Sequence, residues 1–209
     1  MTAPLVDSIY PILADYYPPD QAFLTHRNAY ELLIAVILSA QCTDNRINQV
    51  TPALFEAYPT PEALANASLD AIKVYIQSIN FFNNKAKHIQ AAAHSIVSNF
   101  GGQVPDTLDA MVQLPGVGRK TANVVMSQWF KQPGIAVDTH VARVSRRLGF
   151  HGDTDPVRIE HRLKADWPKA LWSHLSTLLI FHGRTFCMAR RPACETCIIA
   201  QQCPSELTC

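Results

Sequence analysis

Apolar residues at helical spacing limit the possible folds of this chain more than any other feature. Leu33, Ile34, Ile37 and Leu38 follow the spacing of three and four residues that places side chains on one face of a helix. Similar spacing recurs over residues 47–54, 69–76, 89–100 and 171–182. No segment alternates apolar and polar residues for long enough to predict a strand. We therefore expect an all-α fold of roughly ten helices.

Length and composition indicate a folded protein with a sizeable core. The chain has 209 residues, of which 48% are hydrophobic, and this excludes wholesale disorder. Its longest apolar run, Tyr30 to Ala40, contains Glu31 and is far shorter than the ~20 residues that span a bilayer. The N-terminus lacks the basic and apolar regions of a signal peptide. We expect a cytoplasmic monomer with no membrane partner.

Glycine and proline mark the ends of several predicted helices. Gly101–Gly102 follows the segment over residues 89–100 and predicts a left-handed helix end. Thr60–Pro61 and Asp155–Pro156 predict N-caps followed by first-turn prolines. We expect Gly183 to close the helix over residues 171–182.

Charge is distributed unevenly along the chain, although the formal net charge is only +1. Residues 1–110 carry 5 basic and 10 acidic side chains, and residues 151–209 carry 7 and 6. Residues 111–150 carry 6 basic side chains and one acid, Asp138. The six are Arg119, Lys120, Lys131, Arg143, Arg146 and Arg147. This pattern predicts one basic face, which is typical of nucleic-acid binding, on a protein that is otherwise near neutral.

Four of the six cysteines lie within 17 residues, in the pattern Cys187-x6-Cys194-x2-Cys197-x5-Cys203. So dense a group in a chain of this size favours a metal site over a disulfide framework. Four-cysteine zinc sites are common, but they usually contain two CxxC pairs, and this segment contains one. Four thiolates at unequal spacing also suit a cubane iron–sulfur cluster, so the spacing leaves both metals open. Cys42 and Cys209 are interpreted as a core thiol and a tail residue.

The segment from Leu114 to Ala122 predicts a hairpin between two short helices. Pro115 ends the first helix, and Gly116 and Gly118 permit a tight turn into the second. Such a turn presents backbone N–H groups at a helix N-terminus, where dipole and donors together favour a phosphate. An ordinary turn between two helices is the alternative. Its place within the basic segment favours phosphate binding.

Lys120 and Asp138 have both a structural and a functional interpretation. A cation in the first turn opposes the helix dipole and loses a few tenths of a kcal/mol, so Lys120 is oddly placed for a structural residue. It either touches a phosphate or acts as a nucleophile kept partly deprotonated by the helix N-terminus and Arg119. Asp138 either caps the helix that follows it or stabilises positive charge and moves protons for Lys120.

At these residues the sequence resembles the endonuclease III family. The resemblance rests on Leu114 to Val125, on Ala136 to His140 and on the four-cysteine pattern, and it extends from about Glu31 to Cys203. It implies a helix-hairpin-helix glycosylase fold whose two helical domains flank a DNA-binding groove. A six-helix domain over residues 22–132 would carry the hairpin. Residues 1–21 and 133–209 would form a second domain holding a C-terminal [4Fe-4S] loop on Cys187, Cys194, Cys197 and Cys203.

The resemblance also implies an activity, that of a bifunctional DNA glycosylase in base excision repair. Its partner would be double-stranded DNA containing damaged pyrimidines or abasic sites. Lys120 matches the family's Schiff-base lysine, which attacks C1′, expels an oxidised pyrimidine and leads to β-elimination. Asp138 matches the catalytic carboxylate. The implied DNA-binding residues are Gln41, Phe81, Gly116, Gly118, Arg119, Thr121, Arg190 and Arg191.

Some of these residues depart from the family or have simpler interpretations. Gln41 would fill the space left by a flipped nucleotide, but it also suits a polar helix C-cap. Phe81 stands where relatives insert a leucine, and Asn80 replaces a usual glycine, so lesion and opposite-base preference stay open. Arg190 and Arg191 would contact phosphate or lie in a solvated turn. His140 is expected to be a structural hydrogen-bonding residue.

Two other functions compete with this assignment. An adenine-directed mismatch glycosylase would share the hairpin and the cluster, but that branch generally lacks a lysine at position 120. It also carries a glutamate in the helix that here contains Ala35, and it has an additional C-terminal domain. A non-catalytic helix-hairpin-helix module with a structural metal is the other alternative.

Overall fold

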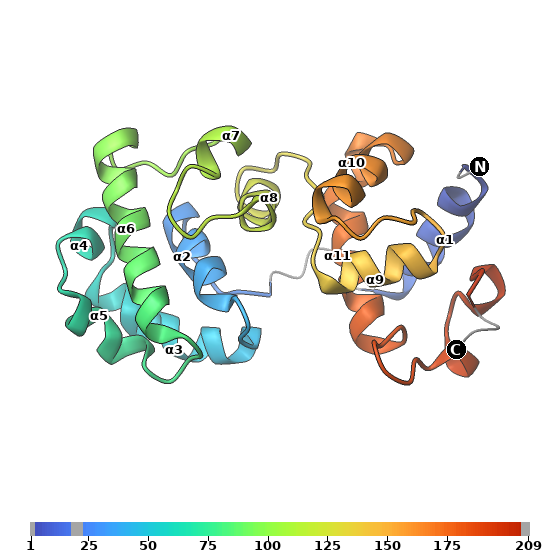
Figure 1. Ribbon diagram of the computed structural model, residues 1–209, viewed down its shortest axis with the longest axis horizontal. Coiled ribbons are helices and arrows are strands. Elements are labelled where there is room, and N and C mark those ends of the chain that lie inside the picture. The colour runs from blue at the N-terminus through green and yellow to red at the C-terminus, as the bar shows by residue number, and fades with distance from the viewer. Residues whose placement is uncertain (1–2, 18–22, 206–209) are drawn as a thin grey trace. The chain divides into compact units, whose positions relative to one another are not determined.

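The chain consists of helices joined by short connections (Figure 1). The computed structural model describes residues 3–17 and 23–205, and for residues 3–6 only the backbone. Within these ranges there are eleven α-helices and three short 3-10 helices, with no strand. The expectation of an all-α fold is therefore confirmed. The chain divides into two compact units, one formed by Ala22–Gln132 and the other by Met1–Gln21 with Pro133–Cys209.

The unit Ala22–Gln132 is built around an almost completely buried helix, α2. Its helices are α2 (Ala29–Ser39), α3 (Asp44–Ala57), α4 (Pro61–Ala65), α5 (Leu69–Ile76), α6 (Phe82–Phe100), α7 (Leu108–Met111) and α8 (Arg119–Gln128). In α2, every residue from Tyr30 to Leu38 is buried. Helices α3, α6 and α8 pack against α2 (Figure 1). The described residues of this unit thus form seven helices where the resemblance implies six, and α7 has only four residues.

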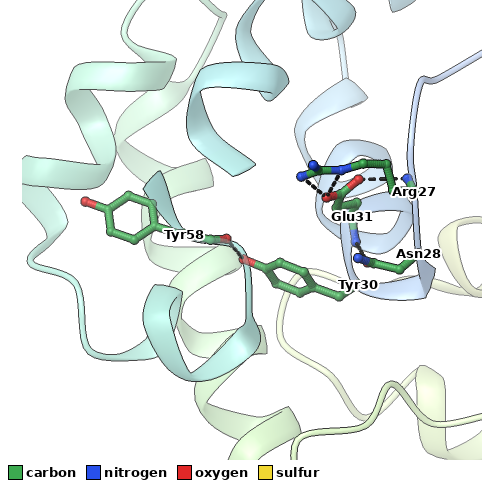
Figure 2. A network of polar contacts seen from close by, with 5 residues as sticks. All are labelled: Arg27, Asn28, Tyr30, Glu31 and Tyr58. Carbon is green, nitrogen blue, oxygen red and sulfur yellow. Dashed lines mark hydrogen bonds and ion pairs between the residues drawn. The ribbon is translucent and has the colours of Figure 1, made fainter. Parts of the chain in front are cut away.

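A polar network sets the start of α2 (Figure 2). Asn28 is the N-cap, and its Oδ1 accepts a hydrogen bond from the Glu31 N–H at 2.9 Å. The buried Glu31 carboxylate accepts from the Arg27 backbone N–H at 2.7 Å and from its Nε at 2.8 Å. The Tyr30 hydroxyl donates to the Tyr58 carbonyl at 3.0 Å. These bonds satisfy a buried carboxylate and fix where the apolar helix begins.

The second unit has its core between α11 and the helices that pack on it. Its elements are α1 (Ala3–Tyr16), α9 (Thr139–Arg147), α10 (Pro156–Asp166), α11 (Trp172–Thr185) and the 3-10 helices η1 (Lys169–Leu171), η2 (Cys194–Thr196) and η3 (Ala200–Gln202). Both α9 and α1 pack on α11. Leu175, Leu178 and Leu179 of α11 are fully buried in this core. The helix predicted from the apolar spacing over residues 171–182 is therefore present, and its apolar face lies in the core.

The predicted helix boundaries are confirmed except at Gly183. Thr60 and Asp155 are N-caps followed by first-turn prolines, and α6 ends at Gly101 with φ +59°. In contrast, α11 continues through Gly183 to Thr185. A Cβ at Gly183 would lie 3.0 Å from His140 Nδ1 and 3.1 Å from Arg143 Nη2. The glycine therefore permits close packing of α9 on α11 and does not end the helix.

Two further expectations concern the membrane and the isolated cysteines. No helix among the described residues is long and apolar enough to cross a membrane. Cys42 is partly buried and packs against the core of its unit. Cys209 lies outside the described residues.

A buried histidine, His151, lies in the core of the second unit next to Ser145. His151 Nε2 lies 2.7 Å from Ser145 Oγ, and the Ser145 hydroxyl donates to the Val141 carbonyl, so the imidazole N–H is the donor to Oγ. Burial lowers the pKa of His151, although the nearby Asp153 carboxylate opposes this, and the Arg146 guanidinium lowers the pKa further. The native state therefore resists protonating a ring that the unfolded chain protonates near pH 6.5.

We expect the free energy of unfolding to fall as the pH is lowered through 6.5, because the unfolded state then binds more protons than the native state. His151→Gln keeps a donor for Ser145 but does not titrate, so its free energy of unfolding should fall less. Urea unfolding followed by circular dichroism at pH 7.5 and 5.5 measures both proteins. An equal decrease in the variant would contradict the prediction.

Candidate functional site

The predicted hairpin is present, and its two glycines have different structural roles. Helices α7 and α8 pack together, and the Val117 N–H donates to the Leu114 carbonyl at 3.1 Å within the connection. Gly116 has φ +76°, and a Cβ there would lie 2.9 Å from His88 Cβ, so the turn requires glycine. Gly118 has φ −89° in extended backbone, and a Cβ would meet nothing within 4 Å. The fold itself does not require a glycine at position 118.

Helix α8 begins without a side-chain cap. Gly118 is its N-cap residue and provides no side-chain cap, and the first turn contains no acidic residue. It contains Arg119 and Lys120, and Lys120 is exposed. Thr121 follows and is partly buried. An uncapped helix N-terminus beside two cations is suited to bind an anion, because backbone donors, helix dipole and side-chain charge act together.

Gln41 and Phe81 share an unusual backbone conformation and are linked through Asn80. Both residues are exposed, with φ +56° and +58°, in the left-handed region that side chains rarely adopt. Phe81 precedes α6, and its side chain is 61% exposed. The Asn80 side-chain amide donates to the Gln41 carbonyl at 3.1 Å. Gln41 follows the C-cap residue of α2, Ala40, so the interpretation of Gln41 as the C-cap is wrong.

Asp138 is the N-cap of α9, and one carboxylate oxygen carries this role. Its Oδ1 accepts from the backbone N–H groups of His140 and Val141, both at 2.8 Å. The side chain is partly buried. The N-cap interpretation is thus confirmed, and the second oxygen is not used for capping.

His140 has contacts that fit the expected structural role. Its Nδ1 lies 3.1 Å from Arg143 Nη2, a group that can only donate. Burial lowers the pKa of His140, while the Asp138 carboxylate opposes and the Arg143 guanidinium reinforces this shift. These contacts hold the His140 ring between α9 and α11, as expected of a structural hydrogen-bonding residue.

All four predicted ligand cysteines line one small cavity, together with Arg147 and His182. Cys187, Cys197 and Cys203 form no disulfide, whereas Cys194 is disulfide-bonded in this structure. No three ligand-type side chains within the described residues are close enough together to hold a single metal ion. Four cysteines around one cavity suit the four corners of a cubane cluster, each of which takes one thiolate, once Cys194 is reduced.

Two arginines counted in the basic segment hold the cysteine loop. Arg143 donates from Nε to the Cys187 carbonyl at 3.1 Å and from Nη2 to the Gly183 carbonyl at 3.0 Å. Arg147 Nη1 lies 2.8 Å from the Met188 carbonyl and 3.3 Å from Cys187 Sγ. Their charge is therefore directed into the protein. Arg190 and Arg191, between the first two cysteines, are exposed as either interpretation requires.

Sequence reasoning missed the residues that contact the cysteines. His182 was expected only on an apolar helix face, yet its Nε2 lies 3.6 Å from Cys197 Sγ. The Tyr17 hydroxyl lies 3.1 Å from His182 Nδ1. The sequence signal for this contact is a histidine on an apolar helix face, five residues before the first cysteine.

Comparisons with known proteins follow the same division of the chain. The family model of the HhH-GPD superfamily of base excision DNA repair proteins matches residues 34–169. The model of the iron–sulfur binding domain of endonuclease III matches residues 187–203. Fold and site thus define a helix-hairpin-helix DNA repair protein with an iron–sulfur loop.

Comparison with individual relatives shows to which family within this class the chain belongs. Endonuclease III of Synechocystis is 48% identical over 93% of this chain and 89% of its own length. That of Bacillus subtilis is 46% identical over 91% and 88%. A solved structure of a trapped endonuclease III–DNA covalent intermediate is 42% identical, with a TM-score of 0.94, and the match covers 100% of this chain and 98% of that one. The chain belongs to the endonuclease III family.

Membership of the family decides between the alternatives left open by the sequence. The chain is a DNA-binding base excision repair enzyme, a DNA glycosylase and apurinic/apyrimidinic lyase, and not a non-catalytic module. Its cofactor is a [4Fe-4S] cluster, so the zinc alternative is wrong.

The different roles of the two hairpin glycines can be tested with the same substitution. Gly116→Ser should lower the free energy of unfolding by about 1–2 kcal/mol, because serine there is left-handed and meets His88. Gly118→Ser should leave stability unchanged or raise it by a few tenths of a kcal/mol, since serine is a good N-cap. The new hydroxyl would take the N–H groups that a phosphate needs, so DNA affinity should fall about tenfold.

Urea unfolding and fluorescence anisotropy with duplex DNA measure the two quantities. Undiminished DNA affinity in Gly118→Ser would contradict the assignment of this helix N-terminus to phosphate.

Proposed function

We propose that this enzyme removes oxidised pyrimidines from duplex DNA and cleaves the resulting abasic site through a Schiff base on Lys120. The observation that carries the proposal is the exposed Lys120 amine in the uncapped, acid-free first turn of α8. A cation there costs helix stability, which a nucleophile next to a bound phosphate explains. The covalent endonuclease III–DNA intermediate of the 42% identical relative supports it, because a Schiff base is such an intermediate.

The reaction proceeds in two stages at the sugar. The Lys120 amine attacks C1′ while the bond to the base breaks, and the base leaves with a proton. The second amine proton passes to O4′ as the bond from C1′ to O4′ breaks, and this ring opening gives an imine between Nζ and C1′. This imine acidifies the C2′ proton, whose removal breaks the bond from C3′ to its phosphate oxygen by β-elimination. Gly116, Gly118, Arg119 and Thr121 hold the neighbouring DNA backbone during both stages.

Asp138 supplies the negative charge for this reaction. Because Oδ1 is occupied by two backbone N–H groups, the carboxylate is held in one orientation. Its second oxygen stabilises positive charge that develops on the sugar as the base departs. Capping and catalysis are thus compatible in one side chain.

Gln41 and Phe81 contact the DNA at the position that the flipped nucleotide leaves. Both side chains are exposed on left-handed residues, and the Asn80 hydrogen bond ties their two connections together. Gln41 fills the vacated space and Phe81 stacks beside the unpaired base. Arg190 and Arg191 contact backbone phosphate. The enzyme acts as a monomer at the nucleoid.

Cys187, Cys194, Cys197 and Cys203 hold the cluster. When bound, the cluster supplies a rigid crosslink for a loop that otherwise has only short 3-10 helices. Arg143 and Arg147 fasten the first part of this loop to α9. The glycosylase step itself requires no electron transfer.

Replacing Lys120 tests the nucleophile directly. Lys120→Gln should abolish borohydride-trapped adducts with DNA containing an oxidised pyrimidine, because the amide cannot form an imine. DNA affinity should fall by less than about tenfold, as expected for one lost phosphate contact. Lys131→Gln removes an equally exposed charge from the same unit and should still form adducts. An adduct with Lys120→Gln, or none with the wild type on any oxidised pyrimidine, would contradict the proposal.

Replacing Asp138 separates capping from catalysis. Asn caps helices as well as Asp does, so Asp138→Asn should change the free energy of unfolding by less than about 0.5 kcal/mol. Its single-turnover base-removal rate should fall by at least about 100-fold, because the charge is lost. Asp155→Asn is the matched control, since Asp155 caps α10 in the same way. Equal rates in the two variants would reduce Asp138 to a capping residue.

A further inference from the structure

Two tyrosine–histidine pairs join the N-terminal segment to α11, and only one of them reaches a cysteine. The Tyr10 hydroxyl lies 2.8 Å from His174 Nδ1, and the Tyr17 hydroxyl lies 3.1 Å from His182 Nδ1. The Nε2 of His174 is buried and has no hydrogen-bond partner. The Nε2 of His182 lies 3.6 Å from Cys197 Sγ. The Tyr10–His174 pair therefore serves as a control for the Tyr17–His182 pair, because it has the same two residue types and no cysteine contact.

His182 lies between the Tyr17 hydroxyl and the Cys197 sulfur, and we take Tyr17 as the donor to its Nδ1. The ring is 2% exposed, so water does not compete for its nitrogens. A tyrosine hydroxyl that donates to Nδ1 leaves the ring proton on Nε2. The Nε2–H then points at the Cys197 sulfur. Tyr17 itself is held by stacking on Phe181, with ring centroids 5.6 Å apart and planes at 11°.

We propose that Tyr17 and His182 are positioning residues that donate a hydrogen bond to the cluster thiolate of Cys197 and so raise the reduction potential of the cluster. The proposal rests on the proposed ligation by the four cysteines. A donor to a cluster sulfur stabilises the more negative, reduced state, which raises the potential. Arg147 makes a corresponding contact to Cys187 at 3.3 Å, so this sulfur also receives a protein donor.

The pair also connects the cluster loop to the helical core. His182 lies on α11, whose core-facing residues are fully buried, and Tyr17 directly follows α1. Cys197 directly follows η2, a helix of only three residues. The position of its sulfur therefore depends on contacts with the larger helices. This places the donor at a rigid site rather than on the loop.

The test is the midpoint potential of the cluster in the purified holoenzyme, measured by voltammetry on DNA-modified electrodes. Tyr17→Phe removes one hydroxyl and keeps the aromatic ring, and His182→Leu removes the donor to sulfur. Both should lower the potential, with His182→Leu having the larger effect. A decrease equivalent to a threefold change in the ratio of reduced to oxidised cluster, about 28 mV for one electron, is the expected minimum. His182→Gln retains an N–H group and should recover part of the loss.

Tyr10→Phe is the matched control, because it removes the same hydroxyl from the pair that reaches no cysteine. Its potential should equal that of the wild type. A wild-type potential in Tyr17→Phe and His182→Leu would overturn the proposal, and so would an equal shift in Tyr10→Phe. If His182→Leu does not fold, Tyr17→Phe against Tyr10→Phe decides the question.

Iron and sulfide analysis separates this proposal from the ligand assignment. Cys197→Ala should lose iron and sulfide, whereas Tyr17→Phe should retain the wild-type content. Full iron content in Cys197→Ala would overturn the ligand assignment and the proposal together. If Cys197→Ala loses iron as expected but Tyr17→Phe and His182→Leu keep the wild-type potential, only the Tyr17–His182 proposal is overturned.

Discussion

Nine consecutive residues of α2, from Tyr30 to Leu38, are buried, and the other helices of the unit Ala22–Gln132 are arranged around them. Each large apolar side chain buried in this way contributes about 1.5–3 kcal/mol, and together they offset the cost of burying the Glu31 carboxylate, whose partner Arg27 stays largely exposed. The same helix supports α8 on one side and leads into Gln41 at its end. Gln41 and helix α8 thus take their positions from a buried apolar helix.

Several features assigned to function depart from what local stability would favour. Helix α8 begins without a cap and with two cations in its first turn, and Gln41 and Phe81 adopt left-handed conformations without being glycine. Other helices of the same unit, such as α3, α4 and α5, begin with a Thr or Ser cap. Departures of this kind are expected where binding, and not stability, selects the residue.

Helix α9 combines structural and functional roles through residues that a charge count does not distinguish. Asp138 caps it with one oxygen, while Arg143 and Arg147 on the same helix hold the segment around Cys187. Six basic residues among the forty from 111 to 150 suggest a single DNA-facing surface. Two of them, Arg143 and Arg147, instead donate hydrogen bonds to backbone carbonyl groups of the protein. A charge therefore predicts nucleic-acid binding only after its hydrogen-bond partners are known.

The helices with apolar spacing, the predicted ends other than that at Gly183, and the hairpin follow from the sequence alone, because spacing, caps and glycine act over three or four residues. The resemblance added the reactive residues and the cluster. Only the tertiary structure showed that Gly183 lies inside α11, that Arg147 contacts Cys187 and that Tyr17 and His182 lead to Cys197. These contacts join residues 40 and 165 positions apart in the two clearest cases, Arg147 with Cys187 and Tyr17 with His182. Periodicity and local motifs contain no information about such pairs, since packing of separate helices brings them together.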